Sequence, residues 1–356
     1  MKKWTAAMAC TAFVLGGCST GNFNQATGLS SGEYGAILPY ESSSMRGKHV
    51  GLIGDVDIRY QLEQGLMELS KAYFNPAEVG YKSHAFLTFD ELDATDGGRG
   101  LLGTLRDNNP NGLNPGSDEK FDTGNGIATG PVILVDLYEL DFYRNNGLAG
   151  IAIGLCVNDE ATVDGTQVKI TPEKMEDYLN VTSNKLVNYM RERFNEIGYN
   201  IPIYVAAYQL NSTETDSSKG GYIYSAFFNG ANTDYKTVDE QYVTVPSSAF
   251  DALDPEMAAQ FNQFKNDMNT VLPDATYTVG EAKFENKKCI KLSLEITTHG
   301  KTAGEILAAV QSAKEKLDVF TSETTEIRVT VNNSNETYAM MTRPANSRDV
   351  QVVTKY

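Results

Sequence analysis

The chain has 356 residues, and its 46 acidic residues outnumber its 30 basic residues, which gives a formal net charge of −16 at pH 7. This surplus argues against nucleic-acid binding, which depends on basic side chains that neutralise phosphates, and against adhesion of the protein surface to an anionic bilayer. Length and composition are typical of a globular protein with about two domains.

The first residues have the pattern of a secretory signal. Lys2 and Lys3 give a charged start, and an apolar run follows over residues 6–15. A charged start, a short apolar stretch and small residues before a cleavage site are the signature of an export signal. The run is shorter than the ~20 residues that a helix needs to span a bilayer. We therefore predict a removable signal here and no membrane span.

The end of this signal has the form of a lipobox. Leu15, Gly16 and Gly17 stand directly before Cys18, and this order is the one at which diacylglycerol is attached to the cysteine sulfur before cleavage. Two acyl chains anchor a protein stably, at about 0.8 kcal/mol per buried CH₂. We predict cleavage before Cys18, a lipid on its sulfur, and a flexible polar tether over residues 18–32. The alternative is an ordinary signal peptide with an incidental cysteine.

Two helices are predicted in the first part of the body. Apolar residues at helical spacing predict a helix over residues 55–74, with Asp55 as its N-cap. A longer helix begins at Thr171-Pro172, because proline fits the first turn of a helix, and it ends at Gly198.

The segments around these helices are strands and one long loop. Residues 93–130 are rich in Gly, Asn, Asp and Pro, which predicts a long loop. Residues 131–142 fit a strand and a helix equally well. Apolar patterning predicts strands over residues 148–157, 201–208 and 222–228.

A polar, proline-marked stretch at residues 229–247 predicts a domain boundary. The elements expected beyond it are helices over 255–271 and 302–318 and strands over 276–284, 289–297, 325–332, 336–342 and 349–355. Their order predicts a helix lying on a mostly antiparallel sheet. The expected fold class is therefore α+β, with two mixed α/β domains. The predicted divisions of the chain are the signal peptide 1–17, the tether 18–32, an N-terminal domain 33–245 and a C-terminal domain 246–356.

Several short motifs follow one another in a fixed order along the chain. They are Leu38-Pro39-Tyr40, Met45-Arg46-Gly47, Gly65-Leu66-Met67-Glu68-Leu69-Ser70-Lys71, Gly112-Leu113-Asn114-Pro115, Glu139-Leu140-Asp141-Phe142-Tyr143, Gly150-Ile151-Ala152-Ile153-Gly154-Leu155, Ile201-Pro202-Ile203, Pro246-Ser247-Ser248 and Phe261-Asn262-Gln263-Phe264. Together with the lipobox, their order resembles the CamS family of sex-pheromone-precursor lipoproteins over nearly the whole chain. The sequence departs from the family at residues 157–162, where members carry a tyrosine-rich run, so no role of those tyrosines is carried over.

The resemblance implies a lipoprotein of a Gram-positive bacterium, held on the outer face of the cell membrane. In the family, the seven residues before the lipidated cysteine are released as a hydrophobic peptide to which donor cells carrying certain conjugative plasmids respond. The corresponding segment here is Thr11–Gly17, which is apolar and uncharged. Its two terminal glycines depart from the usual ending in the family. The resemblance implies no established biochemical activity for the folded body.

The residues offer little for catalysis. A nucleophile needs a base and a group that orients the base, yet His49, His84 and His299 lie in unrelated segments without a nucleophile motif nearby. No Cys/His pair has the spacing of zinc ligands. We therefore expect no enzyme and no cofactor, with an envelope hydrolase as the least favoured alternative. Cys156 and Cys289 show no disulfide pattern and are expected to be inert buried thiols.

One loop has part of a calcium-binding pattern. Asp107, Asn109, Asn111 and Gly112 have the spacing of the first ligands and the glycine of an EF-hand loop, and Asp118 stands at the twelfth place. The usual twelfth residue is Glu, and no helix pair is predicted on either side. Because the same residue types form ordinary turns, a plain loop is the alternative.

Aromatic residues on two predicted strands suggest a binding face. Tyr204 and Tyr208 point to one face of their strand, and Tyr222, Tyr224 and Phe228 share a face of theirs, since side chains alternate along a strand. If the strands pair, these rings form a polar-aromatic platform for a peptide or a glycan. The alternative is that they pack under a helix or at a domain interface.

Two functions from different classes follow from the sequence. The first is a non-enzymatic surface lipoprotein whose signal peptide yields the heptapeptide Thr11–Gly17. The second is an extracytoplasmic module that binds a peptide, a glycan or an envelope protein. The partners expected are the membrane, through the lipid anchor, and the lipoprotein-processing enzymes; no nucleic-acid partner is expected.

Overall fold

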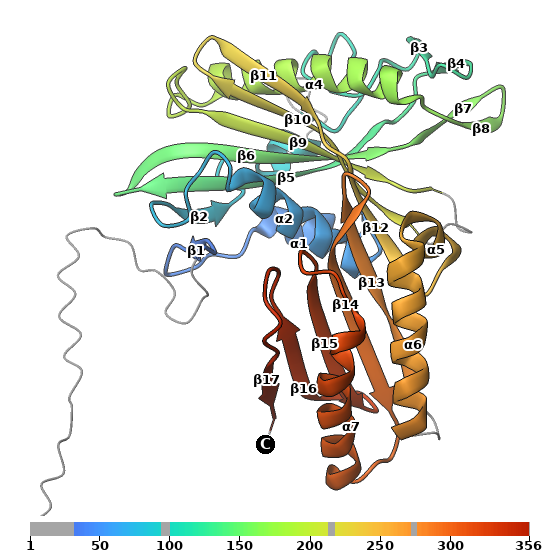
Figure 1. The fold of residues 1–356 in the computed structure, drawn as a ribbon. Helices are drawn as coiled ribbons and strands as arrows, with labels where there is room; N and C mark the ends of the chain where they lie inside the picture. The colour runs from blue at the N-terminus through green and yellow to red at the C-terminus, as the bar shows by residue number, and fades with distance from the viewer. Residues whose placement is uncertain (1–31, 94–99, 213–217, 272–275, 356) are drawn as a thin grey trace, which may run out of the picture.

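The computed structural model describes residues 32–93, 100–212, 218–271 and 276–355. The predicted signal peptide, Cys18 and nearly all of the tether lie outside these residues. One thirteen-stranded sheet runs through the molecule in the order β1-β2-β5-β6-β9-β10-β12-β13-β14-β15-β16-β17, with β11 paired to β10 (Figure 1). Because most neighbouring strands are antiparallel and helices cover parts of the sheet, the predicted α+β class is confirmed.

The first half of the sheet has a helix layer on each face. Helix α4 packs on one face and helix α2 on the other, and each covers its own apolar cluster (Figure 1). The strands are β1 (Gly35–Ala36), β2 (Gly80–Ser83), β5 (Leu134–Arg144), β6 (Gly147–Asn158), β9 (Ile203–Leu210) and β10 (Ser218–Asn229). The helices are α1 (Ser44–His49), α2 (Val56–Ser70), α3 (Phe89–Asp93) and α4 (Pro172–Arg193), and two small hairpins are β3 (Lys120–Asp122) with β4 (Ile127–Thr129) and β7 (Glu160–Val163) with β8 (Thr166–Lys169).

The starts of the two long helices follow from capping. Asp55 accepts hydrogen bonds from the backbone nitrogens of Asp57 and Ile58 at 2.8 and 3.3 Å, so the predicted N-cap is confirmed. Pro172 occupies the first turn of α4, as predicted. The regular part of α4 ends at Arg193, before the predicted end at Gly198.

Strand β5 resolves the ambiguity at residues 131–142 in favour of a strand. It lies inside the sheet between β2 and β6, with clusters above and below it. A strand that is buried on both faces shows no alternation of apolar and polar residues, which explains why its sequence fitted a helix equally well.

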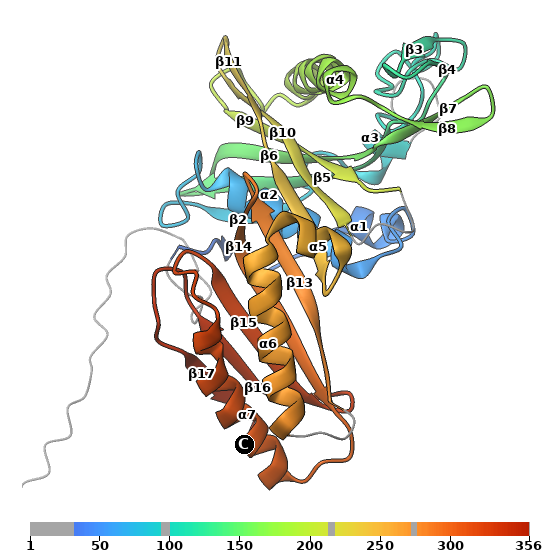
Figure 2. The ribbon, with the colours of Figure 1, turned by 45° about the vertical axis from the view of Figure 1, so that its right-hand side comes forward.

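The second half of the sheet carries helices on one face. Helices α6 and α7 pack against β13–β16, while the opposite face of these strands is not covered by them (Figure 2). Helix α7 begins with a capping box between Thr302 and Glu305 and connects the parallel strands β14 and β15. The elements are β12 (Glu240–Val245), α5 (Ser248–Leu253), α6 (Pro255–Val271), β13 (Tyr277–Glu285), β14 (Lys288–Thr298), α7 (Ala303–Lys316), a 3-10 turn (Leu317–Val319), β15 (Glu326–Asn333), β16 (Glu336–Arg343) and β17 (Gln351–Thr354).

The stretch predicted as a domain boundary forms two strands. Strand β11 (Asn232–Thr237) is exposed along its whole length, which accounts for its polar sequence. Strand β12 pairs with β10 on one side and β13 on the other, so the sheet continues through this stretch. The division into domains at residues 245 and 246 stays a prediction. Cys156 and Cys289 are buried and free, as expected.

Candidate functional site

The predicted aromatic platform is not formed. All five rings are buried, and none is more than 3% exposed. Tyr204, Tyr208 and Tyr222 belong to the cluster under α2, whereas Tyr224 and Phe228 belong to the cluster under α4. A register shift between Tyr222 and Tyr224 breaks the alternation that placed them on one face. The prediction of one exposed face is therefore wrong, and packing under helices, the stated alternative, is what the structure has.

The tyrosine hydroxyls bind protein groups instead. Tyr208 donates a hydrogen bond to Gln61 Oε1 at 2.9 Å, and Gln61 Nε2 donates to Glu281 Oε2 at 2.5 Å. Tyr222 donates to the backbone oxygen of Leu62. These bonds satisfy polar atoms that burial would otherwise leave unpaired. The first links α2 to strand β9, and the second links α2 to strand β13.

The loop with the calcium pattern is held by its own side chains. Asn109 is 2% exposed, and its amide nitrogen donates to the backbone oxygens of Gly100 and Thr104 at 3.0 and 3.2 Å. Asp107 and Asp118 are exposed, and Asn111 is half-buried. Within the described residues, no three His, Cys, Asp or Glu side chains form a group that could hold a metal ion. Calcium binding at this loop stays a prediction.

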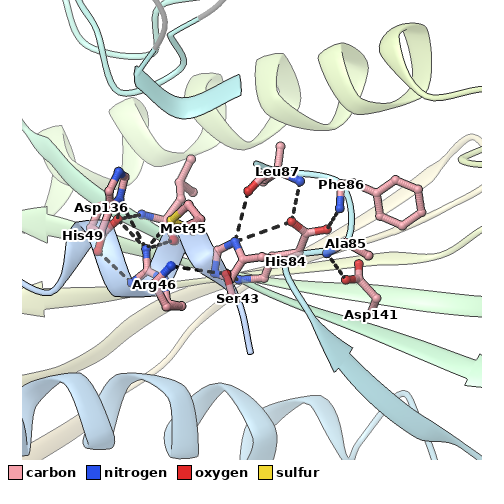
Figure 3. Close-up of polar contacts among 12 residues, drawn as sticks. Ser43, Met45, Arg46, His49, His84, Ala85, Phe86, Leu87, Asp136 and Asp141 are labelled. Atoms are coloured by element: carbon pink, nitrogen blue, oxygen red, sulfur yellow. Dashed lines mark hydrogen bonds and ion pairs between the residues drawn. The ribbon is translucent and has the colours of Figure 1, made fainter. Parts of the chain in front are cut away.

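A buried charged network joins α1 to β5 (Figure 3), and a further contact joins it to α3. Arg46 makes two hydrogen bonds to the carboxylate of Asp136, at 2.9 and 2.8 Å. His49 Nδ1 lies 2.9 Å from the same carboxylate, and His49 Nε2 contacts Asp93 at the edge of the cluster. Asp136 is fully buried. The cluster therefore brings two basic and two acidic side chains together inside the protein.

The charges in this network stabilise one another. Burial raises the pKa of Asp136, but His49 and Arg46 outweigh burial and hold that pKa below its usual value. Burial lowers the pKa of His49, but hydrogen bonds to Asp136 and Asp93 outweigh it and raise the pKa above 6.5. The two carboxylates thus favour the protonated form of His49, and Arg46 pairs with the deeper one.

A second buried network fixes the turn after β2. His84 Nδ1 donates to the backbone oxygen of Leu87 at 3.2 Å, and His84 Nε2 accepts from the backbone nitrogen of Glu139 at 3.2 Å. Both ring nitrogens therefore have hydrogen-bond partners while the ring is neutral. Burial and the charge of Arg46 lower the pKa of His84 to about 3.

Two buried acids of β5 support the same turn (Figure 3). Glu139 accepts from the backbone nitrogens of Phe86 and Leu87 at 3.0 and 2.7 Å, and Asp141 accepts from that of Ala85 at 2.8 Å. Burial raises the pKa of both carboxyls, that of Asp141 to about 6. These groups therefore position backbone rather than face a ligand.

A pocket of about 490 Å³ lies beside these networks, with Ser43, Lys82 and His84 among its lining residues. In the described part of the chain, neither His49 nor His84 hydrogen-bonds to a serine, threonine or cysteine side chain. The networks thus lack the pairing of nucleophile and base that the hydrolase alternative requires.

The larger cavity is a cleft of about 750 Å³ between α2 and the second half of the sheet. Helix α2 contributes Tyr60, Gln61, Gln64 and Glu68 to one wall, and strands β13, β14 and β15 form the other. No local sequence pattern indicates this cleft, because its two walls are far apart in the chain: Gln61 and Glu281 are separated by 220 residues.

Comparison with known proteins indicates one family. The family model described as CamS sex pheromone cAM373 precursor matches residues 40–349. The chain belongs to the CamS family. The resemblance inferred from the motifs is thereby confirmed. Comparison with curated proteins gives no match.

Two solved structures share the fold of this CamS chain. A sex pheromone precursor from Lactobacillus salivarius subsp. salivarius UCC118 is 18% identical, with a TM-score of 0.78 over 92% of this chain and 97% of that one. The C-terminal domain of the sex pheromone staph-cAM373 precursor from Staphylococcus aureus is 20% identical, with a TM-score of 0.69 over 83% of this chain and 96% of that one. At these identities the likeness concerns the fold alone.

The buried network of this CamS protein had a partial signal in the sequence. Asp136, Glu139 and Asp141 stand in the apolar stretch 131–142. Acids inside a buried strand require partners, so a polar network was to be expected there. The partners are His49 and Arg46. They could not be predicted from the sequence around Asp136, because their position depends on how α1 packs.

Proposed function

We propose that this CamS protein is a surface lipoprotein, exported by residues 1–17 and anchored by diacylglycerol on Cys18. The lipobox Leu15-Gly16-Gly17-Cys18 supports the anchor, and membership of a family described as a pheromone precursor supports an exported product. No helix in the described residues is both long and apolar enough to cross a membrane.

The second product of the same precursor is the heptapeptide Thr11–Gly17. It lies directly before the proposed cleavage site and carries no charged side chain. An uncharged apolar peptide partitions into membranes and fits an apolar receptor, which suits an intercellular signal. The observation that carries this function is the match of the family model over residues 40–349.

Replacing Cys18 tests the anchor. With Cys18→Ala, no sulfur remains to receive the lipid, so the protein should leave the washed membrane fraction. Immunoblots of membrane and medium measure the change. Cys10→Ala is the matched control, because Cys10 lies within the removed signal, and its product should stay in the membrane fraction. Retention of the Cys18→Ala product after cleavage of its signal would contradict the anchor.

A second function is supported by the cleft between α2 and the sheet. We propose that the folded body binds a small extracytoplasmic ligand there. The volume of about 750 Å³ falls in the range typical of ligand sites, about 300–1,000 Å³. This role replaces the aromatic platform as the location for the predicted binding module.

A further inference from the structure

The sheet wall of the cleft carries rows of charged residues across three strands. In one row, Lys283 of β13 stands beside Lys291 of β14, which stands beside Glu326 of β15. In the next row, Glu281, Ser293 and Arg328 are neighbours in the same way. All six residues line the cleft. Side chains two residues apart on a strand share a face, so the rows form one charged surface opposite α2.

The cations of this surface differ in how well they are paired. Lys283 lies 2.8 Å from Glu240 and 3.1 Å from Glu285, so its charge is matched within the protein. In the described part of the chain, the acidic group at ion-pair distance from Lys291 is Glu326, at 4.0 Å, and the charge of Glu68 acts from farther away. Arg328 lies 2.6 Å from the same oxygen of Glu326. One carboxylate thus serves two cations.

Lys291 is the underpaired member. Its side chain is 26% exposed, and in the described part of the chain its ammonium has no hydrogen-bond acceptor within the protein. Burial lowers the pKa of Lys291, and the nearby charges of Arg328 and Lys283 lower it further. A half-buried ammonium among other cations gains strongly from an added anion.

The rest of the cleft offers one acidic group to a cation and one amide to a peptide group. Glu285 is paired with Lys283 at 3.1 Å, and Glu33 and Glu68 are paired with Lys71 at 3.0 and 2.8 Å. Glu281 accepts a hydrogen bond from Gln61, and its ion pair with Lys219 is long, at 3.9 Å, so Glu281 is the glutamate that can take a further cation. Gln64 of α2 also lines the cleft and has no partner among the described residues, so its amide can both donate and accept a hydrogen bond. A backbone peptide group carries one donor and one acceptor, so it can pair with the Gln64 amide through both.

We propose that the cleft binds short peptides that have a free C-terminal carboxylate, held by Lys291 and Arg328, and a basic residue near the N-terminus, held by Glu281. This rests on the proposed binding role of the folded body. A neutral glycan fits less well, because it would cover charged side chains of both signs without pairing them. The apolar heptapeptide Thr11–Gly17 has no basic side chain for Glu281 and is not the ligand proposed.

Calorimetric titration of the full chain in detergent micelles tests the ligand class. The probes are Lys-Ala-Ala-Ala with free ends, its C-terminal amide, and tetragalacturonate as a carboxylated glycan. We expect the free peptide to bind, and amidation to weaken binding about tenfold or more, because a charge-assisted bond is lost. Lys291→Met should cause a similar loss, and Lys291→Arg should restore binding. Lys288→Met is the matched control, since Lys288 is exposed on the same strand outside the cleft, and it should bind normally.

Each other outcome overturns a defined part of the proposal. Equal binding of the amide, or unchanged binding by Lys291→Met, would refute the carboxylate site at Lys291. Binding of tetragalacturonate without the peptide would refute the peptide class and leave the binding role intact. If neither probe binds, both the peptide proposal and the binding role of the cleft fail.

Discussion

Buried charge in this protein is concentrated at residues that hold segments in place. Asp136 lies between Arg46 and His49, and His49 reaches Asp93 on the far side. Breaking such a pair leaves an uncompensated buried charge, at a cost of about 3–5 kcal/mol. The sequence showed the acids of β5 but not their partners, because pairing across 87 residues depends on the packing of α1.

The first prediction concerns the pH dependence of this network. The folded pKa of His49 lies above 6.5, its usual value. Its charge therefore contributes stability that is complete below pH 6.5 and is lost as the pH rises through the folded pKa. Urea unfolding between pH 6.5 and 8.5 should show wild-type stability falling more steeply than that of His49→Gln.

His299→Gln is the control for this measurement, because His299 is exposed and far from the network in sequence. The free energy of unfolding of His299→Gln should fall with pH as that of the wild type does. Parallel curves for wild type and His49→Gln would show that the proton on His49 does not stabilise the fold.

At the scale of elements, the four long helices and most of the long strands follow from local pattern, whereas the short helices α1, α3 and α5 do not. Helix α6 occupies Pro255–Val271, the range predicted from its apolar spacing, and Asp55 caps α2 as expected. The faces of β10 could not be predicted, since the register shift after Tyr222 reverses the alternation that the sequence suggests. Such an irregularity depends on pairing with β9 and leaves no local mark.

The second prediction concerns how closely α2 packs on the sheet. A Cβ atom at Gly65 would lie 2.5 Å from Cε2 of Tyr222, whose ring is fully buried. Gly65→Ala should therefore destabilise the fold by about 1–3 kcal/mol through overpacking, although alanine favours a helix by about 1 kcal/mol. Urea unfolding measures the change.

Gly304→Ala is the matched control, since Gly304 lies in α7 with open space at its Cβ position. It should be neutral or slightly stabilising. A stabilised Gly65→Ala variant would mean that α2 does not lie as close to Tyr222 as the structure has it.

At the scale of the whole molecule, the sheet and the cleft both depend on non-local pairing. The sequence predicted the α+β class and the longer helices and strands of each half, but not the β3–β4 hairpin within the predicted loop 93–130. It did not predict that β12 would join the two halves, because the polar stretch around it resembles a linker. The cleft has the same origin: Gln61 and Glu281 meet only because the sheet places β13 beneath α2.

The proposed lipid anchor on Cys18 and the proposed heptapeptide Thr11–Gly17 both lie before the segment that the family model matches, residues 40–349. The most direct test is mass spectrometry of membranes and culture medium from the same cells. We expect a mature N-terminus at Cys18 bearing diacylglycerol, with the peptide Thr11–Gly17 free in the medium. An unlipidated N-terminus at another residue, with no such peptide in the medium, would contradict both proposals.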